Sequence, residues 1–267
     1  MKKRKISESL IRELNSLQNT RNTLEEFLQN FISNSSRYVI FMHDILAKNA
    51  SKDYIMVPVS QYIASLITCW ETYFRDMFVY LASTDEQFLR DVIRHNNINV
   101  EEDDLIRNEL SIGEFVSKFF NFQNLEDTEN AFSPLYEGNS FFKALSEYEL
   151  PFVLFRKGIV THISLIELDQ NWYELINTLF NIRHNIVHDA NYRLELTSDF
   201  ISRAESICIV LPQIVGQFVS EKYGVERPVV DIEHGTIKKI VSGDVDKKFG
   251  YVFTVQDMIA KDWIIKD

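Results

Sequence analysis

A chain of 267 residues with 45% hydrophobic content, eight Gly and five Pro is typical of a packed globular protein and excludes a largely disordered one. The net charge of −11 disfavours a broad basic surface for long nucleic-acid duplexes, because affinity for phosphates comes mostly from Lys and Arg. Residues 85–149 hold 15 acidic and 5 basic side chains, so this segment accounts for nearly all of the negative charge.

The sequence carries no sign of export or of a membrane span. The basic N-terminus is followed by an amphipathic pattern rather than by an apolar core, which is not the pattern of a secretory signal. No run of about 20 apolar residues is present. Cys69 and Cys208 are isolated among apolar neighbours, as suits reduced thiols. We therefore expect a cytoplasmic protein that makes no contact with a membrane.

The first elements in chain order are predicted to be helical. Residues 6–33 carry an apolar stripe at helical spacing, with a possible break at Asn19-Thr20, which predicts one long or two short helices. Residues 34–36 (Asn-Ser-Ser) are a loop and cap signal, and residues 38–47 follow as the next helix. Residues 57–81 are apolar at nearly every turn, so this segment is the expected central helix.

The acidic segment, residues 84–150, has a less regular pattern. It predicts short helices at 86–94 and 112–122, followed by an acidic stretch at 125–130 and a loop. Its aromatic side chains are expected to anchor a satellite core, and its unusual charge also allows a second interpretation as a lid or specificity insert. The anchors are Phe119, Phe120, Phe122, Phe132, Phe141 and Phe142.

Beyond residue 151 a bridging segment leads to two further helices. Asn171 and Glu174 form a capping-box signature, and apolar residues follow at helical spacing, which predicts a helix that runs to about residue 188. The next helix is expected over residues 197–223, because Gly224 is a typical stop signal.

The pattern after residue 224 changes to short β-rich runs separated by glycine-containing turns. The runs are 229–231, 236–241 and 251–255, and a short helix is expected at 257–263. The predicted fold is therefore mainly α. It comprises an N-terminal helical segment (1–34), a helical domain (35–223) that includes the acidic segment, and a small β-containing C-terminal appendage (224–267).

Residues 181–189 are the most informative stretch for function. At about 100° per residue, His184 and His188 share one helix face, Ile186 and Val187 continue the buried side, and Arg183 lies at its border. Arginine keeps its charge and offers a planar donor fork to phosphate, whereas histidine titrates near neutral pH and can move a proton. Those are the groups needed to cleave a phosphodiester without a metal.

Residues 183–188 resemble the Arg-polar-x3-His motif of the HEPN superfamily. Arg183 is followed by the polar His184, three further residues and His188. Members of this superfamily are small helical domains, often metal-independent RNases. A second pattern, Glu71-x3-Arg75, resembles the Glu-x3-Lys/Arg helix of several HEPN branches, especially stand-alone prokaryotic ones. The resemblance covers roughly residues 35–223, so it implies a HEPN-like helical bundle.

The resemblance implies an endoribonuclease in which the ribose 2′-hydroxyl attacks the adjacent phosphate. His188 would act as general base or acid, and Arg183 would hold the phosphate. His184 or Asn185 would orient the histidine or bind the phosphate, and the Glu-x3-Arg pair would lie near the cleft. The tyrosine found two residues after the histidine in one HEPN branch is absent, and Tyr192 lies four residues after it instead.

The resemblance also implies a homodimer in which two copies face one RNA substrate across a twofold axis. Such a dimer doubles the cationic groups in one cleft of an acidic chain. The implied context is prokaryotic defence or a toxin–antitoxin system, with an antitoxin or regulatory protein as a further partner. We expect no metal or other cofactor, because the His184-x3-His188 spacing has no third ligand beside it.

Simpler interpretations remain for each site residue. Arg and His at a helix C-terminus stabilise the helix dipole by roughly 0.3–1 kcal/mol, and an exposed Glu71–Arg75 pair would be worth about 0.3–0.5 kcal/mol. The other histidines have no partners recognisable in the sequence and are expected to be structural: His43, His95, His162 and His234. The alternative function is a non-catalytic HEPN-like module that binds nucleotides or pairs with a nucleotidyltransferase or antitoxin.

Overall fold

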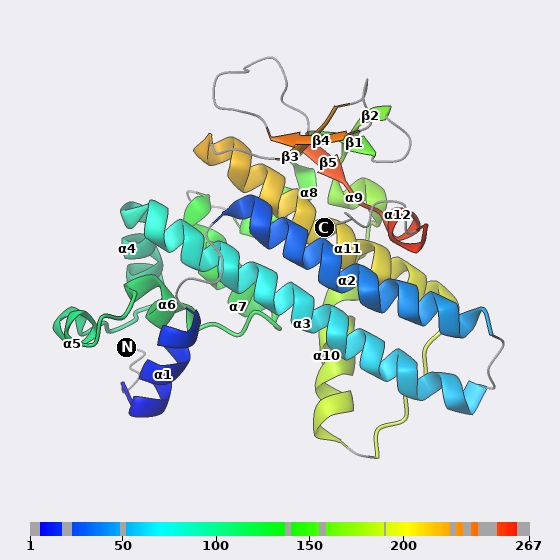
Figure 1. Ribbon diagram of the computed structural model, residues 1–267, viewed down its shortest axis with the longest axis horizontal. Helices are drawn as coiled ribbons and strands as arrows, with labels where there is room; N and C mark the ends of the chain where they lie inside the picture. The colour runs from blue at the N-terminus through cyan, green and yellow to red at the C-terminus, as the bar shows by residue number, and fades with distance from the viewer. Residues whose placement is uncertain are drawn as a thin grey trace.

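The computed structural model describes residues 6–17, 23–48, 52–136, 140–154, 159–189, 191–224, 228–231, 236–239 and 250–260 (Figure 1). The fold of these residues is mainly α, as predicted. Helices α2 (Leu24–Leu46), α3 (Lys52–Thr84) and α11 (Ser198–Tyr223) lie side by side, and α10 (Trp172–His188) packs against α3 and α11. None of the described helices is long and apolar enough to cross a membrane.

The N-terminal region forms two helices, which is one of the two predicted arrangements. They are α1 (Glu8–Leu17) and α2, which begins after the N-cap residue Thr23. The predicted break at Asn19-Thr20 lies outside the described residues. The predicted loop at 34–36 is wrong, because Ser35 and Ser36 donate their hydroxyl hydrogens to carbonyl oxygens one turn earlier and are buried within α2.

Helix α3 is the central element, as predicted, although it starts at Lys52 rather than at residue 57. The earlier start was missed because the first turn precedes the apolar stripe on which the prediction rested. Trp70, Phe74 and Phe78 are fully buried. Together they form one continuous aromatic face along the middle of α3, against which the acidic segment and α10 both pack.

The acidic segment consists of short helices. They are α4 (Glu86–His95), α5 (Glu102–Arg107), α6 (Ile112–Ser117), α7 (Leu125–Phe132), the 3-10 helix η1 (Ser133–Leu135) and α8 (Phe141–Glu147). Helix α4 matches its prediction, whereas α6 ends before residue 122 because the chain turns after Ser117. The stretch at 125–130 is helical: the Asn124 side chain accepts from the N–H groups of Glu126 and Asp127, whose carboxylates lie at the positive end of the helix dipole.

The aromatic anchors of the acidic segment belong to the main core rather than to a satellite. The ring centroid of Phe132 lies 5.8 Å from that of Phe74, 6.2 Å from that of Phe78 and 5.3 Å from that of Phe141. Of the six predicted anchors, Phe119 alone is only partly buried. This packing against α3 favours the interpretation as core over the interpretation as a lid.

Two small sheets lie at one side of the helices (Figure 1). Strands β1 (Leu150–Leu154) and β2 (Ile159–Ile163) form an antiparallel hairpin within the segment interpreted as a bridge, and β5 (Gly250–Val252) pairs parallel with β1. Strands β3 (Pro228–Asp231) and β4 (Thr236–Lys239) pair antiparallel. The predicted β-rich runs thus contain strands where they are described, while residues 240 and 241 lie outside the described part.

The C-terminal segment is attached to the helical bundle by hydrogen bonds and apolar contacts. Buried Gln213 of α11 donates to the Phe253 carbonyl oxygen at 2.9 Å and accepts from its N–H at 2.8 Å. Helix α12 (Val255–Ile259) starts before the predicted residue 257, because Thr254 caps it in a capping box with Asp257. Its Met258 is buried, and α12 packs against α2 and α11.

Candidate active site

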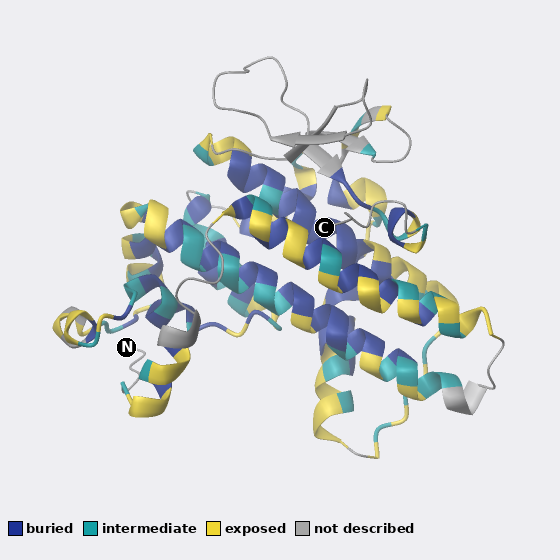
Figure 2. Cartoon of the chain, viewed as in Figure 1, coloured by how far each residue is buried: buried dark blue, intermediate teal, exposed yellow. Residues whose placement is uncertain are grey.

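Helix α10 is fixed to the bundle through its first and middle turns. Trp172 donates its Nε1–H to the Ser146 hydroxyl at 3.2 Å. Phe180 meets Trp70 of α3 edge to face, with ring centroids 5.5 Å apart and an interplanar angle of 84°. Ile182 is the last buried residue of α10, so the C-terminal turns that follow project from the bundle and are largely exposed (Figure 2).

The predicted capping box at the start of α10 is wrong. Asn171 is the N-cap residue, but its side chain makes no capping hydrogen bond. The carboxylate of Asp169 instead accepts from the Asn171 N–H at 2.8 Å and from Arg203 Nε of α11 at 2.7 Å. The hydrogen bond from Arg203 is the main reason that the pKa of Asp169 is lowered. Asp169 therefore joins the starts of α10 and α11.

The motif residues lie together at the free end of α10. His184 and His188 are exposed one turn apart, with ring centroids 4.6 Å apart and planes tilted by 46°. Arg183 is partly buried, and its Nε has no hydrogen-bond partner within the described residues. Asn185 is exposed, and its main-chain carbonyl oxygen accepts a hydrogen bond from the Asp189 N–H at 2.9 Å. This end of α10 thus presents one guanidinium and two imidazoles.

The apolar wall beside the motif differs from the prediction. Ile186 is only partly buried against the core, and Val187 is 51% exposed, so the buried side of α10 does not continue through them. The C-terminal turns of α10 project from the bundle, and the burial of its side chains decreases after Ile182 (Figure 2). An apolar surface therefore stays open next to the two histidines.

The Glu71–Arg75 pair lies on α3. The two side chains form an i, i+4 ion pair, and Gln123 of the acidic segment donates to the other carboxylate oxygen of Glu71. Both side chains are partly buried, and Arg75 Nε has no hydrogen-bond partner in the described part of the chain. No hydrogen bond or ion pair joins this pair to α10 among the described residues. Trp70, which is adjacent to Glu71, packs on Phe180 of the motif helix.

A polar cluster that sequence reasoning missed lies between α2, α3 and α11. Buried Glu205 accepts a hydrogen bond from the Tyr62 hydroxyl, and His43 Nε2 lies 3.4 Å from its Oε1. The pKa of His43 is raised, mainly by the hydrogen bond with Glu205 and less by the charge of Asp44, while partial burial opposes the shift. The signal available in the sequence was a carboxylate inside the apolar stripe of α11, where it requires a partner.

The remaining histidines show no comparable arrangement where they are described. His95 is exposed at the end of α4, His162 is exposed in β2, and His234 lies outside the described residues. Among the described residues, no three His, Cys, Asp or Glu side chains gather as they would around a metal ion.

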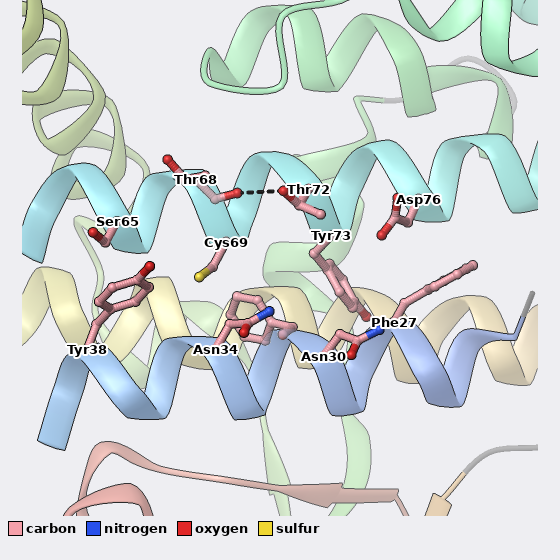
Figure 3. A pocket seen from close by; sticks show the side chains of 11 residues that line it. Phe27, Asn30, Asn34, Tyr38, Ser65, Thr68, Cys69, Thr72, Tyr73 and Asp76 are labelled. Atoms are coloured by element: carbon pink, nitrogen blue, oxygen red, sulfur yellow. Dashed lines mark hydrogen bonds between the residues drawn. The ribbon is translucent and has the colours of Figure 1, made fainter. Parts of the chain in front are cut away.

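A polar groove of about 500 Å³ runs between α2 and α3 (Figure 3). Asn30 and Asn34 line it from α2, Thr68 and Thr72 line it from α3, and the Thr72 hydroxyl donates to the Thr68 carbonyl oxygen at 2.9 Å. Asp76 is the only charged residue among those that line it. Amide, hydroxyl and carboxylate groups without a cation do not suit an anionic phosphate.

A second groove, of about 780 Å³, lies between the start of α3 and the segment that connects α10 to α11. Its α3 side is formed by Met56, Val57 and Ser60, and residues 192–197 form the opposite side. This groove begins four residues after His188, whereas the α2–α3 groove lies on other helices.

The chain matches no protein-family model, and comparisons with curated proteins and with solved structures also find no match.

Proposed function

We propose that this chain is a metal-independent endoribonuclease of HEPN type whose active site is the C-terminal end of α10. The proposal rests on one arrangement at the end of α10. The exposed imidazoles of His184 and His188 have ring centroids 4.6 Å apart. Beside them lies the guanidinium of Arg183, whose buried Nε–H has no hydrogen-bond partner within the described residues. The terminal N–H groups of the Arg183 guanidinium would donate to a phosphate oxygen, and this contact would stabilise charge in the transition state.

The proposed reaction is attack of the ribose 2′-oxygen on the adjacent phosphorus. His188 takes the proton of the 2′-hydroxyl as the new P–O bond forms. The bond from phosphorus to the 5′-oxygen breaks, and the leaving oxygen receives a proton from a protonated His184. Arg183 donates to the non-bridging oxygens, on which negative charge increases, and Asn185 orients the phosphate. The products are a 2′,3′-cyclic phosphate and a 5′-hydroxyl end.

We assign Glu71 and Arg75 a positioning role. They bond to each other and to Gln123, which holds this part of α3 against the acidic segment. Trp70 on the same turn packs on Phe180, one turn before Arg183. The pair therefore supports the helix that carries the site and does not touch the substrate.

The proposed assembly is a homodimer in which the free ends of two α10 helices face one RNA strand. The partly buried Ile186 and the exposed Val187 supply an apolar contact surface next to the histidines. Two Arg and four His from the pair of sites would then lie in one cleft, which offsets the negative charge of the chain. The proposed setting is the cytoplasm of a prokaryote, in defence or as a toxin controlled by an antitoxin or regulatory protein.

The test is RNA cleavage in EDTA by single-residue variants. Arg183→Ala and His188→Ala should each lower the cleavage rate by about 10²- to 10⁴-fold, because each removes a group that acts on the transition state. Helix α4 supplies control positions, since Arg94 and His95 are likewise an adjacent Arg and His near a helix C-terminus, although both are exposed and Arg183 is partly buried. Arg94→Ala and His95→Ala should cleave like the wild type.

Equal cleavage by all four variants would contradict the assignment of the site. A purified chain that binds nucleotides or a protein partner and cleaves no RNA would instead support the non-catalytic HEPN-like binding module. Substitution of the exposed His188 should change the free energy of unfolding by less than about 0.5 kcal/mol. Arg183 is partly buried, so urea unfolding of Arg183→Ala separates loss of stability from loss of the guanidinium.

A further inference from the structure

The connection between α10 and α11 is an extended segment with two distinct sides. Tyr192, Leu194 and Leu196 alternate with Arg193 and Glu195 along it. The first three side chains are partly buried and pack against the core, whereas the two charged ones are exposed. Alternation of this kind is typical of an extended chain, in which successive side chains point to opposite sides. These partly buried side chains therefore attach the segment to the core.

The backbone of this segment is open to a ligand. Within the described residues, no protein group hydrogen-bonds to the N–H or C=O groups of Arg193, Leu194 or Glu195. Across the groove, Val57 of α3 is 74% exposed, and Met56 is partly exposed beside it. The groove thus combines free main-chain donors and acceptors with apolar surface, an aromatic ring at Tyr192 and one cation.

The groove begins close in the sequence to the proposed active site. The Tyr192 N–H donates to the Asp189 carbonyl oxygen at 3.0 Å, and the Asn191 N–H donates to the Asp189 carboxylate at 2.9 Å. The groove therefore begins within four residues of His188 along the chain. We place the nucleotide next to the scissile phosphate in it for this reason.

We propose that this groove binds the unpaired nucleotide next to the scissile phosphate of a single-stranded RNA. The inference rests on the proposed function and adds the residues that would hold the substrate beyond the reacting phosphate. A base offers a flat apolar face to Tyr192, Met56 and Val57, and polar edges to the open backbone. Arg193 contacts the phosphate of that nucleotide. The volume of about 780 Å³ lies within the roughly 300–1,000 Å³ range of pockets for small ligands.

The charges of the groove predict a weak and selective site. Among the described residues that line the groove, Arg193 supplies one cation and Glu195 one carboxylate, so these residues offer one phosphate contact. A duplex keeps its bases stacked and paired and cannot place one in the groove. The groove therefore selects unpaired RNA by the base and not by backbone charge.

The experiment measures binding by fluorescence anisotropy, with the full chain carrying His188→Ala so that the RNA stays intact. The probes are a labelled single-stranded RNA of mixed sequence and the same RNA annealed to its complement. Val57→Asp should weaken binding of the single strand at least about tenfold, because it replaces apolar surface that faces the base with a carboxylate, which must lose water there and which repels an anionic strand. Ile106→Asp is the control, since Ile106 is 67% exposed on α5 and the change of charge is the same.

Two further variants test the role of charge. Arg193→Gln should weaken binding and lower the slope of log affinity against log salt by about one unit, as expected for a lost phosphate contact. Arg37→Gln is its control, because Arg37 is exposed on α2 and is not among the residues that line the groove. It should leave the affinity and the salt slope unchanged. Glu195→Gln should strengthen binding.

The outcomes separate the groove from the catalytic proposal. Equal binding by the Val57→Asp and Ile106→Asp proteins would overturn the groove while cleavage by the wild type still stands. Equal affinity for the single strand and the duplex would also overturn the groove proposal. So would a groove that binds an extended polypeptide and does not bind RNA. A wild-type chain that binds single strands through Val57 and Arg193 yet cleaves nothing would overturn the catalytic proposal alone.

Discussion

Replacement of Phe132 by Ala tests whether the acidic segment is part of the core. Phe132 is fully buried, and its ring contacts Phe74 and Phe78 of α3 as well as Phe122 and Phe141. Loss of a buried Phe side chain costs about 3–5 kcal/mol, and the contacts with several rings put this position in the upper part of that range. Domains of this kind have total stabilities of about 5–15 kcal/mol, so the loss is easily measured.

The assay is urea unfolding followed by circular dichroism of the whole chain. Phe132→Ala should unfold at a clearly lower urea concentration in one transition, and Phe41→Ala, at a 56% exposed position on α2, should change stability by less than about 0.5 kcal/mol. If Phe132→Ala does not fold, Phe132→Leu provides a milder loss at the same site. Equal midpoints for the variants at the two positions would refute the packing argument and favour a separately moving lid.

Two further predictions concern pH and assembly. The hydrogen bond with Glu205 raises the pKa of His43, so the protonated imidazole stabilises the fold. This contribution is fully present below the usual histidine pKa of about 6.5. It is lost as the pH rises through the raised pKa. The difference in unfolding free energy between wild type and His43→Gln should therefore shrink from pH 6 to pH 8, and a constant difference would show that the contact with Glu205 is not energetically coupled to protonation. For the homodimer, Arg183→Ala and His188→Ala chains, each inactive alone, should recover part of the RNA cleavage in mixed dimers, because one shared site keeps both groups. Verified mixed dimers without activity would exclude a shared cleft.

The long helices were predictable because their signals are local. The apolar stripe of α3, the cap at Thr197 and the stop at Gly224 each depend on neighbouring residues, and Gly224 adopts the left-handed conformation that such a stop requires, with φ of 61°. The two histidines of α10 fall on one face for the same reason, since the helix period alone brings residues one turn apart together.

The errors arose where distant or buried partners decide the structure. Ser35 and Ser36 are turn-forming residues by composition, but the apolar packing of α2 keeps them helical. Glu205 meets His43 through the packing of two helices that are far apart in the sequence, which no spacing rule reveals. Asp169 replaces the expected cap of α10 because Arg203 holds it from another helix. The exposure of Val187 likewise depends on where α10 leaves the bundle, which the helix period does not reveal.

The chemical identity of the RNA ends produced in EDTA tests the central proposal most directly. Attack by the 2′-hydroxyl at the Arg183–His188 site predicts products with a 2′,3′-cyclic phosphate and a 5′-hydroxyl, and a single 2′-deoxy substitution at the cleaved nucleotide should block the cut. His188→Ala should yield neither product, and His95→Ala should yield both. Products with a 5′-phosphate, or cleavage that needs an added divalent ion, would contradict the proposed mechanism.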